Sequence, residues 1–141
     1  MSKNYIKILF LFLAIIASQT GFSQDFRLIM ELVVTDDGRK LPNAEIKVLR
    51  NGKEVETVFT DSKGRADIPM GANGVYDISI TGKGMIKKKL NVNTNNVPAE
   101  DLKGDTYFPA EVDIFPKLDG MDLAILSKPI GKIVYDPSIN G

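Results

Sequence analysis

The stretch Phe26-Arg27-Leu28-Ile29-Met30-Glu31-Leu32-Val33-Val34 decides the fold class of this chain. All of its even-numbered positions are apolar, whereas the odd-numbered positions mix Arg27 and Glu31 with aliphatic residues. Alternate side chains of a β-strand point to opposite faces, so this pattern predicts a strand with one buried face.

The same alternation returns along the chain about every ten residues, which is typical of all-β sandwiches and barrels. Residues 123–126 are apolar but few, and they fit either a strand or one buried turn. The other predicted strands cover residues 44–48, 54–59, 66–68, 76–80, 86–92, 107–114 and 130–135.

Turn residues separate the predicted strands. Asn51-Gly52 is the strongest hairpin signal, because a type I′ turn needs positive φ at both central residues and Asn-Gly adopts it readily. Asp61 is expected to accept hydrogen bonds from backbone N–H groups of the next turn, and Gly64 to adopt the left-handed conformation there.

The first 23 residues have the layout of a secretory signal peptide. Lys3 and Lys7 precede the unbroken apolar run of residues 8–17, and the small residues Gly21 and Ser23 predict cleavage after Ser23. A retained membrane anchor is the alternative, but a spanning helix needs about 20 apolar residues. We therefore expect residues 24–141 to be exported to the periplasm, the outer membrane or cell surface, or the medium, without a transmembrane span.

Composition excludes several classes of function. The chain contains no His and no Cys, so it lacks Ser-His-Asp and Cys-His catalysis, the usual zinc sites and disulfides. Without residues 1–23 there would be two more acidic than basic side chains, and so no basic field for nucleic acid. Without disulfides, the fold is expected to be stabilised by its apolar core alone. No cofactor is expected.

Four segments, in order, resemble the carboxypeptidase regulatory-like domain family, also described as transthyretin-like or prealbumin-like. The likeness covers about residues 26–92, and Met85 departs from it because an aromatic residue is common there. The matching segments are residues 41–48 (Leu-Pro-Asn-Ala and a strand), 60–66 (Thr-Asp-Ser-Lys-Gly-Arg-Ala), 74–78 (Gly-Val-Tyr-Asp-Ile) and 81–85 (Thr-Gly-Lys-Gly-Met).

This resemblance implies an all-β Greek-key sandwich, immunoglobulin-like or transthyretin-like, that lacks catalysis and accompanies other domains. In it the hydroxyl of Tyr76 would reach a backbone partner. The sandwich is expected over residues 24–96, with an Asn-rich linker at 91–96. Residues 97–141 would form a C-terminal β extension that pairs with the sandwich or caps it, and residues 131–137 resemble segments of Gram-negative envelope proteins.

Candidate site residues have competing interpretations. Glu111 and Asp113 would lie about 7 Å apart on one strand face, where they form either a glycosidase-like pair or, as we favour, two solvated charges. The turn aspartates Asp36, Asp37 and Asp61 could supply oxygen ligands for calcium, but turn stabilisation is the commoner role.

A binding surface is expected from lysines or aromatic residues. The cluster Lys83, Lys87, Lys88 and Lys89, in which Lys87 and Lys89 would point outward, is either a patch for an anionic partner or, as we favour, the protection of an edge strand. Tyr107 and Tyr135 could stack on sugars, but with Phe108 and Phe115 they fit the core better. The favoured function is a non-catalytic module with a structural or protein-binding role in the bacterial cell envelope; carbohydrate binding is the alternative. The partner would be an envelope protein or polysaccharide.

Overall fold

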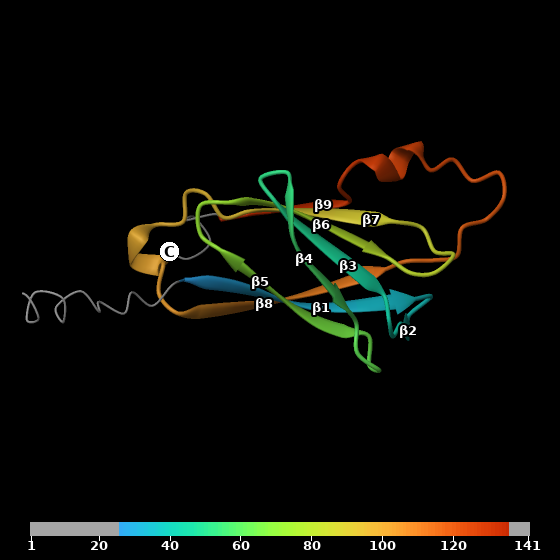
Figure 1. Ribbon diagram of the computed structural model, residues 1–141, viewed down its shortest axis with the longest axis horizontal. Coiled ribbons are helices and arrows are strands. Elements are labelled where there is room, and N and C mark those ends of the chain that lie inside the picture. Colours follow the sequence, from blue (N-terminus) through green and yellow to red (C-terminus); the bar gives the residue numbers. More distant parts are fainter. Residues whose placement is uncertain (1–25, 136–141) are drawn as a thin grey trace, which may run out of the picture.

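Strand β1, Arg27–Asp36, pairs with three other strands and forms the middle of sheet A (Figure 1). It runs antiparallel to β5 and, at its end, to β2, and parallel to β8. The computed structural model describes residues 26–135, so the predicted signal peptide and residues 136–141 lie outside the described part. The other strands of sheet A are β2 (Arg39–Lys40), β5 (Arg65–Gly71) and β8 (Asp105–Asp113).

Sheet B has five strands in the order β4-β3-β6-β7-β9 and faces sheet A across the core. Its strands are β3 (Glu45–Arg50), β4 (Lys53–Phe59), β6 (Val75–Thr81), β7 (Lys88–Asn93) and β9 (Gly131–Val134). All its pairings are antiparallel except that of β9, which runs parallel to β7. Two short 3-10 helices, η1 (Ala99–Asp101) and η2 (Ala124–Ser127), lie in the connections. The predicted all-β sandwich is confirmed.

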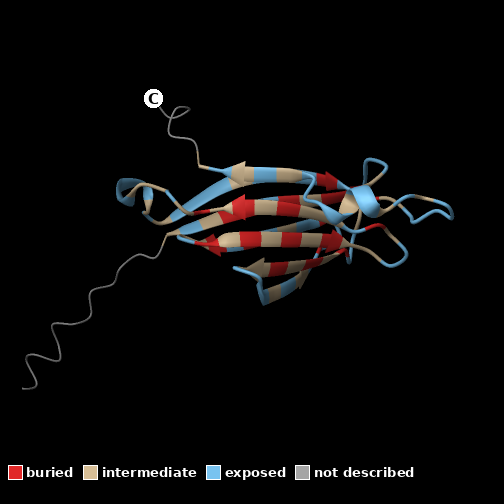
Figure 2. Cartoon of the chain, turned by 90° about the horizontal axis from the view of Figure 1, so that it is seen from above, coloured by how far each residue is buried: buried red, intermediate tan, exposed pale blue. Residues whose placement is uncertain are grey.

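The core lies between the two sheets, and burial alternates along the strands as the sequence predicted (Figure 2). On β1 the side chains of Met30, Leu32 and Val34 are almost completely buried. Within the described residues, every buried side-chain nitrogen or oxygen has a hydrogen-bond partner. The remaining members of the core are Ala44, Ile46, Val48, Ile68, Met70, Tyr76, Ile78, Ile80, Ile86, Leu90, Val92, Val112 and Ile114.

The predicted turns have the expected backbone geometry. Asn51 and Gly52 have φ of 49° and 81°, and Gly64 has φ of 71°. One carboxylate oxygen of Asp61 accepts hydrogen bonds from the backbone N–H groups of Lys63 and Arg65, at 2.8 and 2.9 Å. The positive φ values of Asn51, Gly52 and Gly64 and the hydrogen bonds of Asp61 are those expected for the predicted turns.

Three local predictions are wrong. Residues 91–93 belong to β7 and Thr94 is buried, so residues 91–96 are not a linker over that part. Strand β7 is not an edge strand protected by lysine, because β9 pairs with residues 90–93 on its other side. Residues 123–126 form neither a strand nor a buried turn: η2 has no buried residue, and Ile125 is 78% exposed.

Within residues 26–135 there is no helix with the length and apolar character needed to cross a membrane.

Gly64 makes a close approach to β1 that can be tested by substitution. A Cβ atom there would lie 2.7 Å from the carbonyl oxygen of Val34 and 2.9 Å from the nitrogen of Leu41. Gly84 has nearly the same φ, 70°, but nothing lies within 4 Å of its Cβ position. Gly84→Ala should lower the free energy of unfolding by about 1–2 kcal/mol, because alanine is strained in the left-handed conformation. Gly64→Ala should lower it by about 1–3 kcal/mol more, because its Cβ atom also clashes with the backbone. Urea unfolding measures both losses. Equal losses in the two variants would show that the turn does not contact β1 this closely.

Candidate functional site

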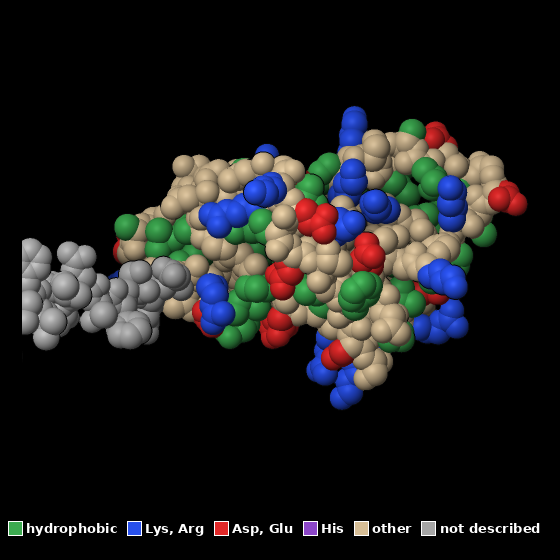
Figure 3. Space-filling model, viewed as in Figure 1, with side chains coloured by type: hydrophobic (Ala, Val, Ile, Leu, Met, Phe, Trp, Pro, Cys, Tyr) green, Lys and Arg blue, Asp and Glu red, His purple; other side chains and the backbone are tan. Residues whose placement is uncertain are grey.

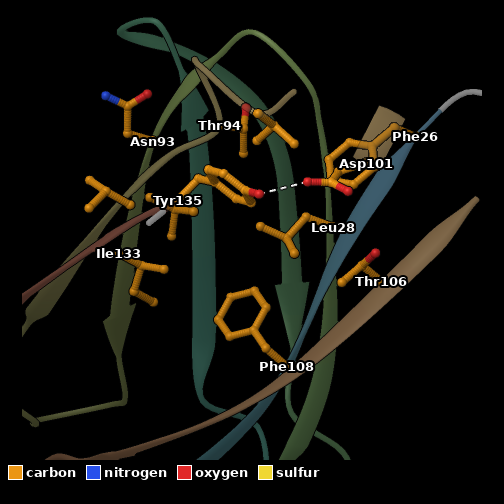
Figure 4. Close-up of a pocket in the computed structure, with 12 residues that line it drawn as sticks. Phe26, Leu28, Asn93, Thr94, Asp101, Thr106, Phe108, Ile133 and Tyr135 are labelled. Carbon is orange, nitrogen blue, oxygen red and sulfur yellow. Dashed lines mark hydrogen bonds between the residues drawn. The ribbon is translucent and has the colours of Figure 1, made fainter. Parts of the chain in front are cut away.

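A cleft of roughly 520 Å³ opens between the sheets at the ends of four strands. Leu28 of β1 and Phe108 of β8 line it from sheet A, and Val92 of β7 and Ile133 of β9 from sheet B. The side chains of Leu28, Phe108 and Ile133 surround an open centre, and Tyr135 lies across it from Phe108 (Figure 4). Strand β8 pairs in parallel with β1 and β9 pairs in parallel with β7, and residues of both added strands line the cleft.

Two polar groups of the cleft have clearly different roles. The hydroxyl of Tyr135 donates a hydrogen bond to Oδ2 of Asp101, at 2.6 Å, and so links β9 to η1 (Figure 4). The buried hydroxyl of Thr94 accepts from the backbone N–H of Gly74, at 3.0 Å, and donates to the carbonyl of Gly71, at 2.7 Å. Thr94 therefore serves the fold, whereas the carboxylate of Asp101 lies at an exposed position on the cleft.

The predicted lysine patch is only partly assembled. Lys87 and Lys89 line one shallow hollow together with Leu123 and Leu126 of the η2 region. Lys83 is exposed in the turn before them. The ammonium of Lys88 instead donates to the carbonyl of Asp113, at 2.5 Å, and lies 5.3 Å from the ring centre of Phe115. Acidic and basic side chains are interspersed over the face seen in Figure 3.

Glu111 and Asp113 each contact a group of the β1–β2 hairpin. Lys40 lies 3.8 Å from Glu111. The hydroxyl of the buried Thr35 donates to Oδ1 of Asp113, at 2.7 Å, and the N–H of Gly38 donates at 3.3 Å. The Thr35 hydrogen bond is the main reason that the pKa of Asp113 is lowered, with a further contribution from Gly38. These contacts tie β8 to β1.

The turn aspartates are likewise engaged in local contacts. Asp36 lies 3.7 Å from Arg39, and Asp61 lies 3.2 Å from Arg65. The backbone hydrogen bond from Arg65 is the first cause of the lowered pKa of Asp61. Over residues 26–135, no three His, Cys, Asp or Glu side chains gather in a way that could hold a metal ion.

The predicted aromatic residues lie on different surfaces. Tyr107 is 57% exposed on the outer face of sheet A, where it lies beside Ile29 in the register. Tyr135 is half-buried in the cleft, and Phe108 and Phe115 are half-buried against the core. The expectation that all four belong to the core is therefore wrong for Tyr107, because odd-numbered residues of β8 face outward, and for Tyr135, which lines the open cleft.

The longer strands at the sheet edges differ in how they resist pairing with another chain. In the described part of the chain, strands β5 and β8 each pair only with β1, and each contains a proline, Pro69 and Pro109. Proline has no N–H to donate and is a common protection of edge strands. Strand β9 is only four residues long. Strand β4, with seven residues and no proline, has neither of these two protections.

Sequence reasoning missed the cleft residues Phe26, Leu28 and Asp101 and the exposure of Val55 and Phe59. Asp101 and Tyr135 are 34 residues apart, and no sequence signal brings them together. The alternation over residues 54–59 predicted a strand, but alternation does not reveal whether a strand is internal or at an edge.

Comparison with known proteins supports the fold. No protein-family model and no curated protein matches the chain. The Bacillus anthracis TIE protein superposes with a TM-score of 0.50 and 23% identity, over 64% of this chain and 18% of that one. Mercury-inhibited catechol 1,2-dioxygenase from Acinetobacter sp. ADP1 superposes with a TM-score of 0.50 and 14% identity, over 83% of this chain and 60% of that one. Wild-type catechol 1,2-dioxygenase from Acinetobacter radioresistens superposes with a TM-score of 0.50 and 12% identity, over 82% of this chain and 60% of that one.

The chain spans less than two thirds of the length of each of these three proteins. At such low identities the likeness shows the fold alone.

The contact between Thr35 and Asp113 makes a pH-dependent prediction. A folded-state pKa below the ordinary value of 3.8 contributes stability above that value and loses it as the pH falls through the folded-state pKa. Thr35→Val removes the hydroxyl donor, so its urea midpoint should lie below that of the unmodified protein at pH 7. The difference between the two urea midpoints should become smaller at a pH well below 3.8, where Asp113 is protonated. Thr106→Val, at an exposed position of β8, is the control, and its urea midpoint should show no such pH-dependent difference from the unmodified protein. A gap for Thr35→Val that is independent of pH would contradict this role.

Proposed function

We propose that this chain is an exported, non-catalytic β-sandwich module of the bacterial cell envelope that binds a protein partner at strand β4. The partner would add an extended segment to the edge of sheet B, with its backbone hydrogen-bonded to β4. The observation that carries this proposal is the open edge of β4, which pairs with β3 alone among the strands of residues 26–135.

The backbone of β4 has hydrogen-bonding groups that face away from the sheet. Thr60, just after β4, donates its N–H to the carbonyl of Ala44, at 3.0 Å, on the β3 side. Backbone groups alternate in direction along a strand, so those of Phe59 and Thr57 point to the free edge. A partner strand could pair there without disturbing the β3–β4 ladder.

The side chains of β4 indicate what kind of segment would fit. Val55 and Phe59 are 55% and 59% exposed, and with Thr57 they lie on the outer face. Glu54 and Glu56 outnumber Lys53 on the strand. Cross-strand pairs stabilise a sheet when apolar side chains meet and when opposite charges face each other. We therefore expect a segment with alternate apolar residues and basic residues between them.

The absence of catalysis is supported by the chemistry of the chain. It has no His and no Cys. Of its candidate catalytic carboxylates, Asp113 accepts a hydrogen bond from Thr35, and Glu111 lies within 3.8 Å of the ammonium of Lys40. Export is supported by the layout of residues 1–23 alone. Membership of the carboxypeptidase regulatory-like family is supported by the Asp61 turn and by Tyr76, whose buried ring has its hydroxyl 2.8 Å from the N–H of Gly71.

Carbohydrate binding by a row of aromatic residues has less support. Tyr107 lies on the outer face of sheet A, Tyr135 in the cleft and Phe59 on the outer edge of sheet B. Sugar stacking on a module of this kind needs several rings on one surface, and these three do not share one.

A photo-reactive amino acid at position 55 tests the proposal in the envelope of the producing cell. It should give a discrete cross-linked adduct with a protein partner, whereas the same group at the exposed position 125, far along the chain in η2, should not. Thr57→Pro removes an N–H at the free edge and should abolish the adduct, and Thr57→Val, which keeps the N–H, should preserve it.

The outcome that would contradict strand addition is an adduct that survives Thr57→Pro in a folded protein. The absence of any adduct from position 55 would also contradict it. Circular dichroism of both variants shows whether they remain folded.

A further inference from the structure

The cleft between β8 and β9 has a lining suited to a positively charged ligand. Among its twelve lining residues three are aromatic, Phe26, Phe108 and Tyr135, and one is charged, Asp101. None of the described residues that line the cleft is a lysine or an arginine. Aromatic faces and carboxylates both attract ammonium and guanidinium groups, so the charge of the site favours cations over anions.

The neighbouring basic group does not compete for this carboxylate. Arg27 follows Phe26 directly, but its guanidinium forms two hydrogen bonds with the side chain of Asp105, at 2.8 and 2.7 Å. Asp101 accepts one hydrogen bond from the hydroxyl of Tyr135. A carboxylate has about four lone-pair positions, so Asp101 retains capacity for donors supplied by a ligand.

The size and shape of the cleft fit a small molecule. Its volume of roughly 520 Å³ lies in the range of small-molecule pockets, which are mostly apolar with a few polar groups that set orientation. Leu28, Phe108 and Ile133 surround the centre, and the Tyr135–Asp101 pair lies to one side (Figure 4). An apolar body would occupy the centre, with its polar group at that pair.

We propose that this cleft binds a small organic cation: an apolar body carrying an ammonium or guanidinium group that contacts Asp101 and the ring of Tyr135. The site is separate from the edge proposed for protein binding, because β9 and β4 are the two opposite edge strands of sheet B. The proposal therefore does not depend on strand addition at β4.

Three probes that differ in charge test it: 4-phenylbutylamine, 4-phenylbutanol and 4-phenylbutyrate, each titrated into the purified protein and followed by the amide NMR spectrum. The amine should bind about fivefold more tightly than the alcohol, as about 1 kcal/mol of cation recognition implies. The carboxylate should bind most weakly. Shifts caused by the amine should map to residues 92–94, 101, 106 and 133–135.

Two substitutions and a control separate the charge from the apolar body. Asp101→Asn should remove the preference for the amine over the alcohol, and Phe108→Ala should weaken both probes. Asp119→Asn, in the exposed turn before η2, should leave all affinities unchanged. The proposal is overturned by equal affinities for the three probes, by shifts that map outside the cleft, or by no binding of any probe.

Discussion

The structure depends on β1, because this strand holds partners on both sides along most of its length. Residues 27–33 pair with β5, and residues 27–35 pair with β8 on the other side. The same strand sends Met30, Leu32 and Val34 into the core, where they are almost completely buried. Burial of one such side chain stabilises a fold by about 1.5–3 kcal/mol, so backbone pairing and core packing reinforce each other at β1.

The addition of β8 to β1, and of β9 to β7, also shapes the surfaces that could bind ligands. Both late strands run parallel to their partners, and the cleft lies between them. Their positions leave β4 as the long edge strand on the opposite side of sheet B. One surface offers an open, mostly apolar cleft beside a carboxylate, and the other offers free backbone groups, so the two proposals concern chemically different ligands.

The strands could be predicted from sequence because alternation is a local property, as in residues 26–34 and 76–80. The turns at Asn51-Gly52 and Asp61 could be predicted because the residue types themselves favour that backbone geometry. The pairing between distant strands could not be predicted. Arg27 and Asp105 are 78 residues apart and meet in a parallel register that no turn specifies. For the same reason the edge position predicted for β7 is wrong, and the sequence does not reveal the cleft or the contact of Tyr135 with Asp101.

The most direct test of this account is hydrogen exchange of the backbone amides in the native protein. Among the described strands, β8 pairs with β1 alone, so the protection of its amides depends on that contact. The account predicts that amides of residues 105–113 that face β1 exchange slowly, with protection similar to those of residues 27–35. Fast exchange throughout residues 105–113, with β1 and β5 still protected, would show that β8 is not part of the sheet.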